Sequence, residues 1–187
     1  MKQNSLALIL GSLAIPPMAQ ALEFNHIQTD NSTIAFVYKQ MGVPIEGVLK
    51  KFDAQFNFDP AKLPTAKAVF AMHLTSIDAG TQEANDEIAQ KVWFDTQDFP
   101  QAKFVSSTIQ ALGDNRYQVT GQLSIKGRTK DVSGNFSYSG QHNIAVFDGT
   151  FTLNRADFAI GEGAWANFGI VANEILIKFH LLADAGK

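Results

Sequence analysis

Apolar and polar residues alternate along most of this chain, which is the pattern of β-strands with one buried face. The alternation predicts about eight strands, separated by residues that favour turns, such as those at positions 42–44 and 113–115. The predicted strands span residues 31–40, 45–58, 66–76, 102–107, 117–125, 132–138, 147–153 and 171–181.

One segment departs from this alternation. From about residue 82, Ala84, Ile88 and Val92 recur at helical spacing, and Thr81 stands where an N-cap is expected. A single amphipathic helix has no second helix to pack against, so we expect it to bury its apolar stripe against the sheet. The predicted fold is therefore all-β: an antiparallel lipocalin-like barrel of about eight strands, with one short helix that closes an end.

The interior of this barrel is open to two interpretations. Glycines at positions 47, 121, 134 and 149 fall on the predicted inward faces, where glycine either bends a strand or leaves space inside. The 15 phenylalanines either fill a dense core or line an apolar cavity.

The N-terminal residues have the features of a secretory signal. Lys2 precedes an apolar run over residues 6–15, and Ala19 and Ala21 form the small-x-small pattern that signal peptidase prefers. We expect cleavage after Ala21, so that residues 1–21 are a signal peptide and residues 22–187 form a single domain.

Composition and motifs argue against several functions. A net charge of −3 disfavours nucleic acid as a partner, and the absence of cysteine excludes disulfides and thiolate chemistry. The 4 histidines have neither helical i, i+4 spacing nor a plausible carboxylate partner in the sequence, and there is no nucleophile elbow. We expect no catalytic residue, no metal site and no required cofactor. The acidic residues Asp78, Glu83, Asp86 and Glu87 are interpreted as a solvated helix end.

Three groups of residues resemble the signatures of a known family. They are residues 74–78 with 85–86, 93–95 and 99–107; residues 120–132; and residues 154–158. In this order they are similar to the YceI-like family of exported lipocalin-like barrels. The resemblance implies a polyisoprenoid ligand in the barrel, either an isoprenoid quinone or a prenyl phosphate.

Two details qualify this resemblance. Asn85 and Ile88 stand where the family commonly has arginine and histidine, so a head-group role for those basic residues is lost or moved. Residues 161–165 resemble a subgroup linked to a membrane b-type cytochrome, which implies such a cytochrome as a partner and weakly favours a quinone. A homodimer is a further hypothesis.

We expect the ligand to contact apolar side chains inside the barrel. Trp93, Phe94 and Trp165 adjoin turns or helix ends, where the mouth of a barrel lies. The strand candidates are Phe36, Phe56, Phe70, Met72, Phe104, Leu123, Phe136, Phe151 and Ile177, and packing in a solid core is an equal alternative for the strand residues. Arg155 and Asp157 are predicted to pair and fix a turn.

The sequence therefore predicts a periplasmic carrier that sequesters an isoprenoid lipid and has no chemistry of its own. One alternative is a ligand-free accessory or stress-response partner of a membrane b-type cytochrome. A second is a small enzyme that acts on a hydrophobic substrate inside the cavity.

Overall fold

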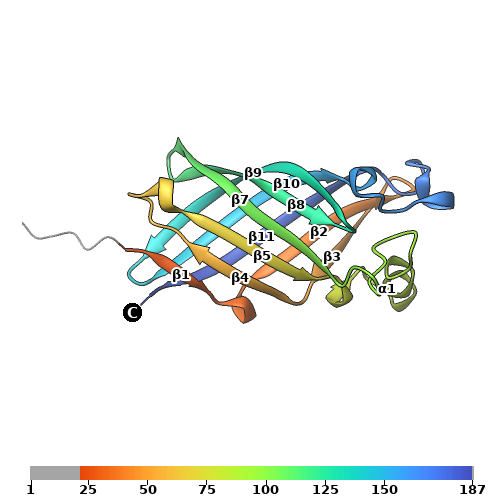
Figure 1. Cartoon of the computed structure of the whole chain (residues 1–187), viewed down its shortest axis with the longest axis horizontal. Helices are drawn as coiled ribbons and strands as arrows, with labels where there is room; N and C mark the ends of the chain where they lie inside the picture. The colour runs from red at the N-terminus through yellow and green to blue at the C-terminus, as the bar shows by residue number, and fades with distance from the viewer. Residues whose placement is uncertain (1–21, 187) are drawn as a thin grey trace, which may run out of the picture.

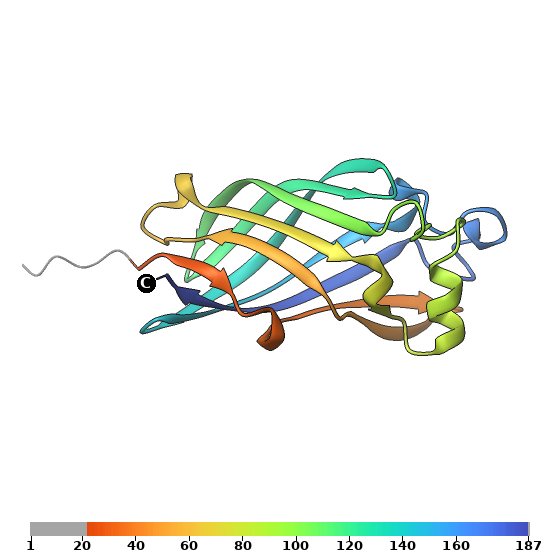
Figure 2. The same cartoon turned by 60° about the horizontal axis from the view of Figure 1, so that its bottom comes forward.

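The structure is a computed structural model that describes residues 22–186, so the predicted signal peptide lies outside the described residues. Its 11 strands form one antiparallel sheet, which curls into an elongated barrel (Figure 1). Figure 2 shows that the first and last strands lie together at one end, and that the single α-helix lies at the other. The all-β, lipocalin-like prediction is confirmed.

Most of the 11 strands pair with a strand next to them in the chain. They are β1 (Phe24–Ile27), β2 (Thr33–Gln40), β3 (Val43–Leu49), β4 (Phe52–Asn57), β5 (Lys67–His73), β6 (Ile77–Asp78), β7 (Gln101–Gly113), β8 (Arg116–Ile125), β9 (Arg128–Gln141), β10 (Ile144–Asn154) and β11 (Glu174–Ala185). Their order in the sheet is β4-β5-β7-β8-β9-β10-β11-β2-β3-β6, with β1 on β11. The helical segments are η1 (Thr29–Asn31), η2 (Leu63–Thr65), η3 (Leu74–Ser76), α1 (Gln82–Ile88), η4 (Arg155–Phe158) and η5 (Gly163–Ala166).

The prediction of about eight strands was wrong, because there are 11. The predicted strand over residues 45–58 is two strands, separated by a bend at Lys50 and Lys51 whose backbone groups bond to Ser76 and His73. The other additions, β1 and β6, have 4 and 2 residues. Segments this short show no periodicity that a sequence pattern can detect.

The short strands help to close the sheet. Phe24 of β1 and Phe58, just after β4, exchange two backbone hydrogen bonds of 2.9 Å, so β1 lies between β11 and the β4 edge. At the other end, β6 pairs with β3. Because β6 follows β5 through η3, this pairing brings the two edges of the sheet together.

Aromatic rings fill the end of the barrel where β1 lies. We define the aromatic cluster as Phe24, Phe56, Phe58, Tyr117, Phe136, Tyr138 and Phe147. Phe58 is fully buried, and its ring centroid lies 5.1 to 5.3 Å from those of Phe147, Tyr138 and Tyr117. Edge-to-face packing at such distances stabilises aromatic pairs beyond their burial alone. This half of the barrel is therefore solid.

The inward glycines make room for rings from neighbouring strands. A Cβ at Gly47 would overlap the Phe36 ring, and one at Gly121 would lie 2.7 Å from atoms of the Phe104 ring. At Gly149, a Cβ would overlap the Phe179 ring. The space left by glycine is thus occupied by phenylalanine, which is a third outcome beside the bend and the empty space considered from sequence.

The predicted helix is confirmed as α1. The backbone N–H of Ala84 donates to Thr81 Oγ1 at 3.2 Å, so Thr81 is the N-cap. The helix ends at Ile88, and Val92 lies beyond it with 37% of its surface exposed. No helix within residues 22–186 is long and apolar enough to cross a membrane.

Replacing Phe58 with alanine tests the aromatic cluster. The substitution removes a ring at the centre of five aromatic contacts, so we expect the free energy of unfolding to fall by about 3–5 kcal/mol. Urea denaturation measures this loss. As a control, Leu112→Ala at the exposed end of β7 should change the stability by less than about 0.5 kcal/mol. A Phe58→Ala loss as small as that of the control would contradict a solid core here.

Candidate functional site

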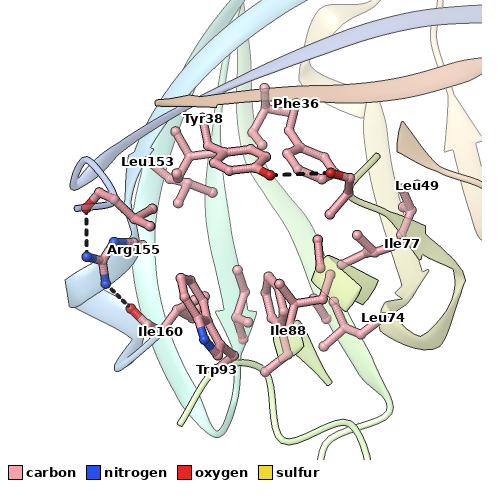
Figure 3. Close-up of a pocket in the computed structure, with 18 of the residues that line it drawn as sticks. Phe36, Tyr38, Leu49, Leu74, Ile77, Ile88, Trp93, Leu153, Arg155 and Ile160 are labelled. Atoms are coloured by element: carbon pink, nitrogen blue, oxygen red, sulfur yellow. Dashed lines mark hydrogen bonds between the residues drawn. The ribbon is translucent and has the colours of Figure 1, made fainter. Parts of the chain in front are cut away.

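An apolar cavity of about 530 Å³ occupies the α1 end of the barrel. Its walls come from strands β2, β3, β5, β6, β7, β8, β10 and β11, from η3, α1, η4 and η5, and from connecting segments such as the one after α1. Figure 3 shows Phe36, Ile88 and Leu153 among the side chains that surround this space. The aromatic cluster lies beyond it along the barrel, so the cavity occupies only part of the interior.

Most of the predicted ligand-binding residues are brought together here. Those that line the cavity are Phe36, Met72, Trp93, Phe94, Leu123, Phe151, Trp165 and Ile177. They come from seven different segments, and the curvature of the sheet turns them toward a common space. Whether they contact a ligand stays a prediction.

The other four candidates lie outside the cavity walls. Phe56 and Phe136 belong to the aromatic cluster, and Phe70 packs beside Phe52 on the larger buried core that contains this cluster. Phe104 packs against a second group of buried residues near α1 without lining the cavity. Alternation correctly placed these side chains on the inward face, but it carries no information about position along the barrel axis.

Several lining residues were missed by the sequence analysis. Tyr38, Leu153 and Ile175 stand two positions from predicted candidates, on the same face of their strands and closer to the α1 end. The inward alternation contained this signal. Val171 also lines the cavity and follows the alternation of the predicted strand 171–181, although β11 begins only at Glu174. Ile160 lines the cavity from outside the predicted and the observed strands, where no periodic pattern marks it.

The cavity opens beside the first turn of α1. Thr81 and Glu83 line it and are also exposed to solvent. In the cavity wall, the Tyr38 hydroxyl donates to the carbonyl oxygen of Ala79 at 3.3 Å (Figure 3). Burial raises the pKa of Tyr38 above its usual value, so this hydroxyl stays neutral at physiological pH.

Glu87 connects the helix to the loops that close this end. The indole N–H groups of Trp93 and Trp165 both donate to Glu87 Oε1, at 3.0 and 2.7 Å. The centroids of the two indole rings lie 5.4 Å apart. Because Glu87 is half-buried and lines the cavity, its assignment to a solvated helix end was wrong.

Arg155 holds the loop around η5 through backbone carbonyl groups. The side chain is 1% exposed, and its N–H groups donate over distances of 2.6–3.1 Å. The acceptors are the carbonyl oxygens of Ile160, Gly161, Trp165, Val171 and Ala172.

These five bonds match the five N–H donors of a guanidinium group. Burial lowers the pKa of Arg155, yet a guanidinium remains charged in proteins. The predicted partner, Asp157, is exposed and is absent from this set of acceptors. The expectation that Arg155 fixes this region holds, but it does so through the backbone instead of an ion pair.

Three histidines have a carboxylate neighbour that the sequence did not reveal. The pairs are His26 with Asp184 at 3.3 Å, His73 with Asp53 at 2.8 Å, and His180 with Asp148 at 2.6 Å. Each pair joins two strands, so it appears only once the strand pairing is known. None of these residues lines the cavity. Within residues 22–186, no three His, Cys, Asp or Glu side chains are placed to hold a metal ion.

Sequence comparisons show that this chain is similar to a family of bacterial proteins. The model of the YceI-like domain matches residues 26–183. A UPF0312 protein of Pseudomonas putida is 32% identical over 175 residues, covering 88% of this chain and 91% of the relative. One from Pseudomonas savastanoi is 31% identical over 170 residues, covering 86% and 88%.

Two solved structures resemble this barrel. BcnA of Burkholderia cenocepacia has a TM-score of 0.82 and 43% identity, covering 84% of this chain and 99% of its own. A polyisoprenoid binding domain from Saccharophagus degradans, implicated in plant cell wall breakdown, has a TM-score of 0.67 over 89% of this chain and 100% of its own. At 13% identity the second similarity supports the fold alone.

Replacing Arg155 with lysine tests how the cavity end is held. A lysine ammonium has three donors at one point and cannot reach five carbonyl groups, so buried acceptors lose their partners. At least two of the five acceptors then lack a donor, and at about 1–3 kcal/mol for each we expect the free energy of unfolding to fall by at least about 2 kcal/mol.

Urea denaturation measures this loss. The chain has 2 tryptophans, both beside Arg155, so a red shift of native fluorescence should accompany it. The control is Arg116→Lys, an exposed arginine paired with Asp114, which should leave both measurements unchanged. Equal behaviour of the two variants would contradict this role of Arg155.

Proposed function

The chain belongs to the YceI-like family, and from this premise we propose that it is an exported carrier that binds an isoprenoid lipid without transforming it. The observation that carries the proposal is the apolar cavity of about 530 Å³ at the α1 end. Such a cavity lies in the size range of small-molecule sites and is lined as they are, by aliphatic and aromatic side chains. The polyisoprenoid binding domain from Saccharophagus degradans, with the same fold, lends further support.

The cavity size limits how much of a ligand is enclosed. Taking about 30 Å³ for each water-sized group, a volume of 530 Å³ accommodates about 18 such groups. An isoprenoid tail of about that many carbons fits inside. A much longer tail extends through the opening beside α1 or displaces side chains of the aromatic cluster.

The polar lining favours an uncharged head group. Glu83 and Glu87 lie at or near the opening and are acceptors when ionised. The cation in the wall, Arg155, already donates to five carbonyl groups and offers no free N–H. A prenyl phosphate would meet two carboxylates and no available donor from arginine. We therefore favour an isoprenoid quinone or alcohol over a prenyl phosphate.

Burial of the tail provides the binding free energy. Each enclosed methylene contributes about 0.8 kcal/mol, so the tail needs no dedicated polar anchor. Ordering of the tail and loss of its translational freedom offset part of this gain.

The proposal also includes a cellular compartment for the protein. The signal-like pattern in residues 1–21 is the reason to expect export, and the periplasm is the proposed compartment. A b-type cytochrome partner and a homodimer remain hypotheses drawn from the sequence.

Extraction of the purified protein tests the carrier function. Organic solvent applied to protein from its native host releases any bound lipid, and mass spectrometry identifies and quantifies it. We expect an uncharged isoprenoid near one molecule per chain. A protein that is empty and stays empty after incubation with isoprenoids would overturn the proposal and favour the ligand-free partner. Conversion of an added isoprenoid would favour the enzyme.

A pair of variants on β10 links the lipid to the cavity. Leu153 lines the cavity, whereas its neighbour Thr152 is exposed on the opposite face. We expect Leu153→Trp to occupy the cavity and lower the bound lipid at least about tenfold, since losing the burial of about two methylene groups already corresponds to that factor. The control Thr152→Trp adds the same ring outside and should retain the lipid. Equal lipid content in two folded variants would place the lipid elsewhere.

A further inference from the structure

Four apolar side chains are exposed around the cavity end of the barrel. They are Met41 at 77%, Val43 at 61%, Phe168 at 50% and Ile170 at 37% exposure, and we call them the apolar rim. They lie on two segments, the β2–β3 turn and the loop after η5. The backbone N–H of Met41 donates to the carbonyl oxygen of Ile170 at 2.8 Å, which holds the segments together.

The apolar rim continues directly from the cavity wall. Gln40 and Val171 pair as a β-bridge and both line the cavity. Their neighbours in the chain, Met41 and Ile170, are exposed on the outside. The opening beside Thr81 and Glu83 lies at this same end of the barrel. An apolar molecule that leaves the cavity therefore emerges near exposed apolar side chains.

The β2–β3 turn differs from the other two-residue hairpin turns of the described chain. Four turns have residues with positive φ at their tips: 41–42, 114–115, 126–127 and 142–143. Asparagine, aspartate and glycine usually occupy such positions, and the other three tips carry polar side chains. Met41, at φ 51°, places a large apolar side chain in a conformation that costs free energy. Lys126, at φ 49°, bears a similar backbone cost, so the feature that sets the β2–β3 turn apart is the apolar side chain that its tip exposes to solvent.

We propose that the apolar rim docks the barrel on the surface of a lipid bilayer, where the isoprenoid enters or leaves the cavity. This inference rests on the proposed carrier function. Residues 39–43 and 166–172 carry a single charged side chain, Lys39. A short apolar surface of this kind inserts into the boundary between lipid head groups and acyl chains.

A bilayer fits the apolar rim better than a protein partner does. Stable protein interfaces involve about 20–30 residues on each side, and the rim has far fewer. Transfer at the bilayer surface also spares the isoprenoid a passage through water, which opposes the exposure of apolar chains. Since the rim carries little charge, docking depends on apolar insertion more than on anionic lipids.

Two double variants test the docking surface. Met41→Ser with Val43→Ser removes apolar side chains from the rim without altering the cavity lining. The matched control, Leu112→Ser with Ile144→Ser, removes apolar side chains of 49% and 47% exposure from the ends of β7 and β10, beside the turns at the opposite end of the barrel. Delipidated full-length mature protein is loaded with geranylgeraniol, an uncharged isoprenoid alcohol, from phosphatidylcholine vesicles or from detergent micelles. Mass spectrometry measures uptake after the protein is separated.

We expect the rim variant to load from vesicles at least about tenfold more slowly than the wild type, because fewer apolar groups enter the bilayer surface. Final loading from micelles should match the wild type. The control variant should match it with both donors, and raising the salt concentration should change the vesicle rate by less than about twofold.

The possible outcomes distinguish a failure of the docking surface from a failure of the carrier function. Equal vesicle rates for the rim variant and the wild type, together with normal loading from micelles, would overturn the docking surface and leave the carrier intact. Failure of the wild type to load from either donor would overturn the carrier function. Vesicle transfer that requires an added membrane protein would replace the bilayer with a protein partner and also overturn the inference.

Discussion

The cavity end of this barrel depends on the hydrogen bonds of one buried arginine. Arg155 donates to carbonyl groups spread over residues 160–172, a stretch outside the named strands. Carbonyl groups buried without partners would destabilise such a stretch. The guanidinium satisfies five of them at one point and thereby positions Trp165, whose indole reaches Glu87 on α1. This stretch supplies part of the cavity wall and, through Phe168 and Ile170, part of the apolar rim.

The two ends of the barrel differ in how their interiors are filled. At the β1 end, rings from distant strands fill the interior, and this core stabilises a chain that has no cysteine for disulfides. At the α1 end the interior holds about 530 Å³ of space. Unfilled apolar space lowers stability, so the solid half offsets what the cavity costs. An enclosed isoprenoid tail would regain part of that cost by filling the space.

Three polar side chains that line the cavity bond to the protein itself. The Tyr38 hydroxyl bonds to Ala79, one oxygen of Glu87 accepts from two indoles, and Arg155 is fully used. The interior therefore presents mainly hydrocarbon to a ligand. Binding governed by apolar burial selects a ligand for the length and bulk of its tail more than for a particular head group. This selectivity agrees with a carrier function and with an exit lined by apolar side chains.

The sequence by itself determined the class of fold, the helix with its Thr81 N-cap, and the inward face of each long strand. These features are local, since alternation and capping are set by residues a few positions apart. Only the tertiary structure decided which inward residues meet at the cavity. Phe36 and Phe136 look alike in the sequence, yet one lines the cavity and the other packs in the aromatic cluster. Strand register and barrel curvature separate them, as they also bring Asp148 beside His180, and both come from pairings between residues far apart in the chain.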